Sequence, residues 1–523
     1  MFPSPTAGHR LALVPEILSN ILQRLGRSDQ VCPARVCKFW CDVATGLIWD
    51  TVADLRVLFQ LLAPLDTNDG MVIFTRALTC KDWVRFDYYA RKARQVLQTH
   101  WRSQSLHPSL VEEILSTRSP PHLLPNLRRV EFICCPLNCL HVFLHSSITE
   151  LIIHYECGFS LLGSILVSLP TKTPAITSIF ISENVVTAGE STNAMNMFAE
   201  ALPGLSSLKS LSLPIHWLTP AIVDATASCS SLYKLSTTSL DDETEDIELF
   251  DYDQLYSLSL PPCGFPAIKS LSVILPFARA ARFISQGDHF DALTRFEGQS
   301  PYSVTTSQEY ATLLSMLSKH CPNLEVIILF ATEPPETVPE HASVPYAELS
   351  SVTRLTALRT VSFHHTRPFQ IVTKDIVAIV RALPNLTTLV LNPIPHISTT
   401  SPLAISVLST LRDLCPNLIS LGLYLDAADD HIPSPPANDD EHRRAVPATA
   451  EFMSLKSFTI GWSSLSSPIS LAVYLSSVLP DDCVLDTSRD AIHRDDVRRL
   501  IPVFKQVRAQ GMRTGRITCE NSR

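Results

Sequence analysis

The chain has 523 residues, of which 46% are apolar and 18% are charged, a composition that excludes a largely disordered protein and leaves room for several domains or one long repeat array. Its formal net charge of −9 argues against a general role in nucleic-acid binding, because phosphate binding requires concentrated lysine and arginine. No run of about 18 uncharged apolar residues occurs and the N-terminal segment lacks the pattern of a signal peptide, so we expect no membrane span and a soluble protein of the cytoplasm, the nucleus or both.

The first predicted element is a helical hairpin over residues 13–49. Pro15 suits the first turn of a helix, where a missing N–H costs nothing, and Gly26 ends that helix. Apolar residues at helical spacing form two stripes, Ile17, Leu18, Ile21, Leu22 and Leu25 in the first, and Val31, Val36, Phe39, Trp40 and Val43 in the second. Because so short a segment cannot hide this much apolar surface within itself, we expect part of it to face a partner.

Four stretches of this hairpin resemble the F-box, the motif by which F-box proteins bind the adaptor Skp1. They are PEIL at 15–18, IL at 21–22, VCKFW at 36–40 and LIW at 47–49. The resemblance implies that Skp1 contacts Pro15, Ile17, Leu18, Ile21, Leu22, Val36 and Trp40, with support from Leu47 and Trp49. A role in the core of the hairpin is the alternative for each of these side chains, and for Trp40 in particular.

The hairpin departs from the F-box pattern at three positions. Val14 stands where the family usually has leucine, and Gln30 interrupts an apolar pair. Pro33 falls where the second helix should run, and because proline disrupts the hydrogen bonding of a helix interior, we expect that helix to be short or kinked.

Residues 53–120 predict a helical linker region. Residues 55–65 have a dense apolar face, and residues 81–97 place Trp83, Phe86, Tyr89, Ala93 and either Val96 or Leu97 at helical spacing. The second of these segments resembles one that follows the F-box in many fungal F-box proteins. Its basic residues Arg85, Arg91, Lys92 and Arg94 fit a solvated helix face better than a binding patch.

Over residues 121–488 a short module recurs, with apolar residues at its first, fourth and sixth positions. Its copies are Leu127/Val130/Phe132, Ile148/Leu151/Ile153, Ile176/Ile179/Ile181, Leu208/Leu211/Leu213, Leu255/Leu258/Leu260, Ile268/Leu271/Val273, Leu324/Ile327/Leu329, Leu358/Val361/Phe363, Leu386/Leu389/Leu391, Leu418/Leu421/Leu423 and Leu455/Phe458/Ile460, with degenerate copies at Leu232/Leu235/Thr237 and Leu293/Phe296/Gly298. Twelve steps from Leu127 to Leu455 give a period of about 27 residues, and the alternation predicts one strand with a buried face in each copy. This period and pattern are those of leucine-rich repeats.

Amphipathic segments between the modules predict one helix per repeat. They are residues 190–202, 307–321, 373–383 and 401–415. Pro-Asn-Leu at 125–127, 322–324, 384–386 and 416–418 sets the corner between helix and strand, because proline cannot continue a helix. The 13 residues from Leu255 to Ile268 are too few for a helix, so one of those two copies is not a full repeat.

Two polar insertions and a last helix complete the pattern. Residues 241–253 hold eight acidic and no basic residues, and residues 426–451 are polar and rich in proline. We expect both to be solvated loops, with contact to a basic partner as the alternative. Residues 489–523 predict a final helix whose Val497, Leu500, Ile501 and Phe504 cap the last repeat, in preference to a helix that binds nucleic acid.

Little in the sequence indicates catalysis. The glycine-rich loops GxGxxG, GxxxxGK[ST] and GxSxG are absent, as is HExxH, so no nucleotide cradle, nucleophile elbow or zinc-protease helix is predicted. The 14 cysteines are scattered without a CxxC pair, which favours reduced core thiols. One cluster has metal-like composition, Cys134, Cys135, Cys139 and His141, but it lacks the two separated pairs that zinc requires. His364 and His365 fit a histidine pair without a task, so we predict no catalytic residue, cofactor or metal.

Together these features predict an α/β protein in four parts. They are a three-helix F-box-like motif at 1–52, the helical linker region at 53–120, an irregular leucine-rich-repeat array of parallel strands and helices at 121–488, and a C-terminal helix and tail at 489–523. The resemblance implies a non-enzymatic adaptor of a Skp1-cullin-F-box ubiquitin ligase, which binds Skp1, and through it a cullin, by the F-box and an unidentified target protein by the repeats. The alternative is a leucine-rich-repeat scaffold with no role in ubiquitin transfer.

Overall fold

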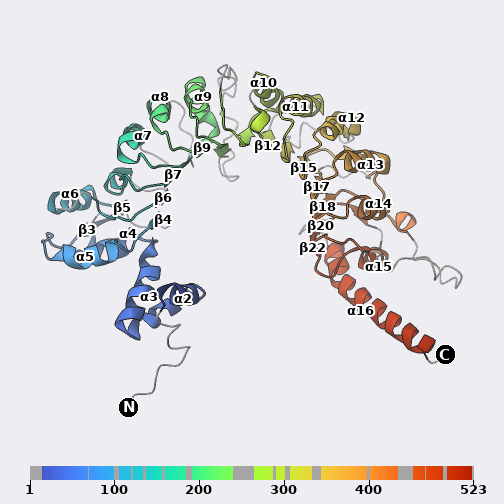
Figure 1. The fold of residues 1–523 in the computed structure, drawn as a ribbon, viewed down its shortest axis with the longest axis horizontal. Coiled ribbons are helices and arrows are strands. Elements are labelled where there is room, and N and C mark those ends of the chain that lie inside the picture. Colours follow the sequence, from blue (N-terminus) through green and yellow to red (C-terminus); the bar gives the residue numbers. More distant parts are fainter. Residues whose placement is uncertain are drawn as a thin grey trace, which may run out of the picture. The chain divides into compact units, whose positions relative to one another are not determined.

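A computed structural model describes most of the chain, and Figure 1 shows its helices and strands. The described residues are 14–68, 70–98, 105–118, 122–133, 137–155, 159–183, 191–238, 264–286, 290–300, 307–331, 343–396, 401–433, 451–465, 467–486 and 492–520. The acidic segment 241–253, the copy Leu255/Leu258/Leu260, Cys134, Cys135 and most of 426–451 lie outside these residues. The chain divides into two compact units, Met1–Ala267 and Ile268–Arg523.

The N-terminal hairpin consists of two α-helices joined by turns of 3₁₀ helix. α2 spans Pro15–Leu22 and α3 spans Lys38–Asp50, with η1 at Asp29–Val31 and η2 at Pro33–Arg35 between them. Pro33 lies in the first turn of η2, where its missing N–H leaves no bond unmade. As expected from Pro33, the helical path before α3 is short and broken.

Residues 51–118 combine helices with short strands, whereas the sequence suggested helices alone. The helices are α4 (Leu55–Phe59), α5 (Asp82–Ala90) and α6 (Pro108–Thr117), and the strands are β1 (Thr51–Val52), β2 (Leu65–Asn68), β3 (Met71–Phe74), β4 (Gln95–Gln98) and β5 (Ser105–Leu106). The helix expected over 81–97 ends at Ala90, and Val96 and Leu97 lie in β4, which pairs in parallel with β1 and β6. The parallel sheet therefore begins at Thr51, before the first copy of the apolar module.

Seven described strands of the first unit form one parallel sheet. Their order is β1, β4, β6 (Arg129–Ile133), β7 (Glu150–Tyr155), β8 (Ser178–Glu183), β9 (Ser210–Pro214) and β10 (Lys234–Thr238). The fourth position of each module stays in register from strand to strand, so Val130, Leu151, Ile179, Leu211 and Leu235 form one buried row. The module therefore encodes the strand and its buried face.

The second unit repeats this arrangement with eight described strands. They are β11 (Ser270–Ile274), β12 (Arg295–Ser300), β13 (Val326–Ala331), β15 (Thr360–His365), β17 (Thr388–Leu391), β18 (Ser420–Leu423), β20 (Ser457–Thr459) and β22 (Val484–Asp486). Two short parallel pairs flank them, β14 (Val344–Pro345) with β16 (Phe369–Gln370), and β19 (Asp426–Ala427) with β21 (Ser464–Leu465). The degenerate copies at 232–237 and 293–298 also form strands, β10 and β12.

Helices alternate with these strands and lie on one side of each unit's sheet (Figure 1). The α-helices are α7 (Phe159–Lys172), α8 (Ser191–Ala201) and α9 (Pro220–Ala227) in the first unit, and α10 (Phe277–Ser285), α11 (Ser307–His320), α12 (Tyr346–Leu349), α13 (Thr373–Ala382), α14 (Val407–Leu414), α15 (Pro468–Val478) and α16 (Ile492–Glu520) in the second. Short 3₁₀ helices are η3 (Leu137–Val142), η4 (Leu202–Gly204), η5 (Ile215–Trp217), η8 (Phe290–Ala292), η10 (Ser350–Arg354) and η11 (Asp429–His431). Parallel strands with intervening helices confirm the predicted α/β fold with leucine-rich-like repeats.

Asparagine side chains join neighbouring repeats at the corners between helix and strand. Asn126 donates from Nδ2 to the Arg91 carbonyl at 2.6 Å, and Asn323 donates in the same way to the Asp291 carbonyl at 2.8 Å. Both residues belong to the Pro-Asn-Leu corners of the sequence. The proline turns the chain, and the asparagine satisfies a backbone carbonyl of the preceding repeat.

The last helix packs against the end of the second unit. α16 contacts α15, and its Val497 and Ile501 are buried while its Leu500 and Phe504 are half-buried. These are the four side chains expected to cap the array. Within the described ranges, no helix combines the length and the apolar character that crossing a membrane requires.

Candidate interaction surface

The small core of the N-terminal hairpin is built from both helices. Leu18 and Leu22 of α2 and Ala44 of α3 are at most 2% exposed. Phe39, Trp40, Val43 and Leu47 of α3 pack against them while remaining half-buried. Of the nine residues predicted to contact Skp1, Leu18 and Leu22 therefore hold the hairpin together, and Trp40 and Leu47 contribute to the same core.

Five aliphatic side chains of the hairpin face solvent, and we refer to them as the hairpin rim. They are Val14, Ile21, Leu25, Val31 and Val36, with exposed fractions between 37% and 63%. Ile21 and Val36 are the predicted docking residues in this set, and Pro15 is exposed beside them. Val14, Leu25 and Val31 were not among the predicted docking residues, although Leu25 and Val31 belong to the same two apolar stripes.

Two polar side chains fix the turn between the helices. Gln30 donates from Nε2 to the carbonyls of Leu22 at 3.1 Å and Leu25 at 3.4 Å. Arg27 donates to the carbonyls of Ile48 at 3.1 Å and Thr51 at 2.7 Å. Leu22 ends α2 and Ile48 lies in the last turn of α3, so both side chains add hydrogen bonds near helix ends. Gln30, which departs from the F-box pattern, thus replaces an apolar contact by hydrogen bonds that close α2.

Contacts from α5 and the segment after it hold the hairpin against the start of the repeats. The rings of Trp49 and Tyr89 lie 4.6 Å apart, and Lys92 Nζ lies 2.5 Å from Asp42 Oδ1. The hydrogen bond from Lys92 lowers the pKa of the Asp42 carboxyl. Trp49 is therefore an internal contact, and Lys92, expected on a solvated face, has a side chain only 16% exposed.

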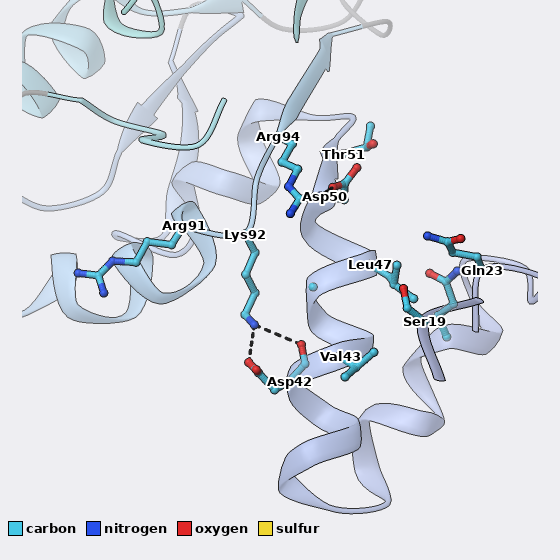
Figure 2. Close-up of a pocket in the computed structure, with 12 residues that line it drawn as sticks. Ser19, Gln23, Asp42, Val43, Leu47, Asp50, Thr51, Arg91, Lys92 and Arg94 are labelled. Carbon is cyan, nitrogen blue, oxygen red and sulfur yellow. Dashed lines mark hydrogen bonds and ion pairs between the residues drawn. The ribbon is translucent and has the colours of Figure 1, made fainter. Parts of the chain in front are cut away.

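A polar groove of about 600 Å³ lies between the hairpin and this segment, as Figure 2 shows. Ser19, Gln23, Asp42, Val43, Leu47, Asp50, Thr51, Arg91, Lys92 and Arg94 line it, together with Gln30 and Gly46. Lys92 extends across it to Asp42, and Arg94 Nη1 lies 3.8 Å from Asp50 Oδ1. Acidic and basic side chains pair with one another in the groove, and these pairs hold the hairpin against the segment after α5. The groove is therefore polar and distinct from the apolar rim.

Several of the described cysteines and histidines of the repeats lie in the core. Burial raises the pKa of Cys139 and Cys321 to about 12, so both remain thiols at neutral pH. Burial, and secondarily the charge of Arg367, lowers the pKa of His365 to about 3, and its Nδ1 accepts the Arg367 N–H at 2.9 Å. Among the described residues, no three His, Cys, Asp or Glu side chains are placed to hold a metal ion.

His364 lies on the solvent side of β15 and stacks on Phe330 of β13. Their ring centroids are 4.5 Å apart with an interplanar angle of 7°, and burial lowers the pKa of His364. The parallel register places the two residues opposite one another. The two histidines, for which we predicted no functional role, therefore lie in different places. His365 is in the core, and His364 stacks on Phe330 on the open face of the sheet.

One buried contact between a histidine and a carboxylate was not predicted. His216 Nε2 in η5 lies 2.6 Å from Glu183 Oε2 at the end of β8, and both side chains are at least 92% buried. Burial, together with the charge of Glu183, raises the pKa of the nearby Tyr155 hydroxyl. The pair joins segments 33 residues apart along the sequence, and no local motif announces such a contact.

Comparisons with known proteins identify no family for this chain. No protein-family model matches the chain, and no curated protein matches its sequence. Among solved structures, an internalin of Listeria monocytogenes is 13% identical with a TM-score of 0.35, covering 71% of this chain and 82% of that one. A TLR13 complex with ssRNA13 is 11% identical with a TM-score of 0.34, covering 74% of this chain and 55% of that one. The APL1 leucine-rich repeat domain is 10% identical with a TM-score of 0.26, covering 84% and 85%.

Proposed function

We propose that the protein is a substrate-recognition adaptor of a Skp1-cullin-F-box ubiquitin ligase, and that the hairpin rim is its docking surface for Skp1. The observation that carries this proposal is the division of the hairpin into a core of three well-buried residues and a rim of five exposed aliphatic side chains. The F-box resemblance of residues 15–49 supplies the partner. The rim supplies the apolar surface that such a partner would cover.

Burial of the hairpin rim would contribute several kcal/mol to docking. Full burial of one aliphatic side chain contributes about 1.5–3 kcal/mol, and interfaces concentrate their free energy in a few central residues. Ile21 and Val36 are 54% and 63% exposed, so each has more than half of its surface left to bury. Pro15, Ile17 and Trp40 add partly exposed surface beside them.

The contacts that hold the hairpin in place suit a protein that positions a target near a partner. Arg27, Gln30, Trp49 and Lys92 fix the hairpin internally and against the segment that begins the repeats. A target protein held by the repeats would then be kept near a ligase assembled on the hairpin, which raises its effective concentration without any chemistry by this chain. The repeats would supply the target-binding surface and the hairpin the link to Skp1 and the cullin.

Co-purification with Skp1 tests the proposal. The double variant Ile21→Asp with Val36→Asp should lose Skp1, because two carboxylates would have to be desolvated in an apolar interface. Val84→Asp in α5 is the matched control, since Val84 is 74% exposed and lies outside the rim. Leu18 and Leu22 are unsuitable targets because their substitution would disrupt the hairpin core.

Equal recovery of Skp1 with the wild type and the rim variant would contradict the proposal. Absence of Skp1 from the wild-type protein would do the same and would favour the alternative, a leucine-rich-repeat scaffold without a role in ubiquitin transfer. Circular dichroism of both variants should match the wild type, because all three substituted side chains face solvent.

A further inference from the structure

The last strand of the second unit has an open hydrogen-bonding edge. β22 is the terminal strand in the sheet order, and β20 is its partner. The Val484 N–H donates to the Lys456 carbonyl at 2.8 Å, and the Asp486 carbonyl accepts from the Ile460 N–H at 3.2 Å. Because alternate residues of a strand direct their backbone groups to opposite edges, the N–H and C=O of Leu485 point away from β20. Neither group has a hydrogen-bond partner among the described residues.

A groove of about 580 Å³ runs between this edge and α16. Cys483, Val484 and Leu485 line it on the strand side. The helix side consists of Arg498, Ile501, Pro502, Lys505, Gln506 and Ala509, which recur at the three- and four-residue spacing of one helix face. We refer to this feature as the edge groove. One wall is β22, with the unpaired backbone groups of Leu485, and the other wall is α16, which the groove separates from that strand.

A proline interrupts the backbone hydrogen bonding of the helix wall. Pro502 lies inside α16 and has no N–H, so the Arg498 carbonyl four residues earlier lacks its usual helical donor. Arg498 and Pro502 both line the edge groove. An occupant with its own backbone donors and acceptors would pair with the free groups of Leu485 on the strand wall.

The charges of the edge groove favour an acidic occupant. Arg498 and Lys505 are its basic residues and Asp481 is its acid. Lys505 Nζ lies 3.1 Å from Asp481 Oδ1, but that carboxylate is 91% exposed, so solvent weakens the pair. Arg498 is exposed and has no ion-pair partner in the described part of the chain. Burial raises the pKa of Cys483 to about 11, which keeps its thiol neutral.

We propose that the edge groove binds an extended segment of a partner protein, which adds to β22 as a further strand and places an acidic side chain against Arg498 and Lys505. Strand addition uses the backbone groups of Leu485 for affinity and the side chains of the groove for selectivity. An extended segment fits because the free groups lie on a strand edge, which a helical ligand cannot pair with. This site is independent of the hairpin rim and does not rest on Skp1 binding.

A weak-binding assay with a defined peptide tests this proposal. The probe is a fluorine-labelled acetyl-Thr-Val-Glu-Val-Thr-amide, titrated into the full-length protein and followed by fluorine NMR. Replacing its glutamate with lysine should weaken binding about fivefold, the size expected for one exposed charge contact. Methylating the nitrogen of one central residue, in a separate peptide for each position, should weaken it about tenfold for the position that donates to β22, because one backbone hydrogen bond is lost.

Charge reversal on α16 supplies the matched comparison. Arg498→Glu should invert the preference, so that the lysine peptide binds more tightly than the glutamate peptide. Arg499→Glu is the control, because Arg499 is equally a surface arginine of α16 but does not line the edge groove. Equal binding of all peptides, or equal effects of the two arginine variants, would overturn the proposal. A concentration-dependent dimer that excludes the peptide would also overturn it, by showing that the edge pairs with a second copy of the chain.

Discussion

The N-terminal hairpin and the repeats use apolar residues in opposite ways. In the repeats, the module positions of described copies such as Leu208/Leu211/Leu213 and Leu358/Val361/Phe363 are all fully buried. In the hairpin, Leu18, Leu22 and Ala44 are buried while five aliphatic side chains remain exposed. The repeats therefore use their apolar residues for folding, whereas the hairpin leaves a large part of its apolar surface exposed.

The two regions also differ in what holds them in place. Each inner strand of the repeats is paired on both sides, so neighbouring copies support one another. The hairpin depends on a few long side chains, namely Arg27, Gln30, Trp49 and Lys92. So small a core is marginally stable by itself, and contacts with a larger body stabilise it.

Phe363→Ala should give the largest effect, and it tests whether the repeats depend on their buried residues for folding. Phe363 is fully buried and its ring lies 5.6 Å from that of Tyr310, so we expect a loss of about 3–5 kcal/mol in the stability of the second unit. Hydrogen exchange of the β13 and β15 amides measures it. A loss of stability below about 1 kcal/mol would show that neighbouring side chains repack to fill the space left by Phe363.

Leu22→Ala should have a smaller effect, confined to the hairpin. The hairpin core is small and borders solvent, so we expect a loss of about 2–3 kcal/mol and faster exchange of the α2 and α3 amides, with β8 unchanged. Val36→Ala is the control and should change exchange little, because Val36 is exposed. Equal acceleration in β8 would break the comparison, since the hairpin would then be part of one cooperative unit with the repeats.

The Lys92–Asp42 brace should give the smallest and a pH-dependent effect. The pKa of Asp42 is lowered in the folded protein, so the pair stabilises the hairpin above the unfolded pKa of about 3.9 and loses that contribution as the pH falls through the folded value. Because Asp42 is 68% exposed, the contribution is below about 1 kcal/mol.

Asp42→Asn provides the measurement for this brace. It should accelerate exchange of the α3 amides at pH 7, and its difference from the wild type should shrink as the pH falls through the lowered folded pKa of Asp42. A difference that persists unchanged at low pH would assign the contact between α3 and Lys92 to packing.

The repeats could be predicted from the sequence because their signal is local and repeated. Alternating apolar residues located even the degenerate strands β10 and β12. β1 and β4 were missed because β1 has two residues and because Ala93 and Val96 fit helical spacing as well as they fit a strand. The contact between Glu183 and His216 was missed because it depends on the stacking of adjacent repeats.

The hairpin could be predicted as an element, but the side of it that remains exposed could not. Leu18, Ile21 and Leu22 share one apolar stripe, yet Ile21 is exposed while the two leucines are buried. Periodicity identifies apolar residues on a helix and gives no information on which neighbour covers each of them. The packing of α3 against α2 decides which of these side chains is covered.

Hydrogen exchange of the full-length protein with and without purified Skp1 tests the central claim most directly. Docking on the hairpin rim should slow exchange in α2 and in the turns from Leu25 to Val36, and leave the strands of the second unit unchanged. The Ile21→Asp with Val36→Asp variant should show no such protection. Binding of Skp1 with protection confined to the repeats, or no protection in the wild type at saturating Skp1, would contradict the claim.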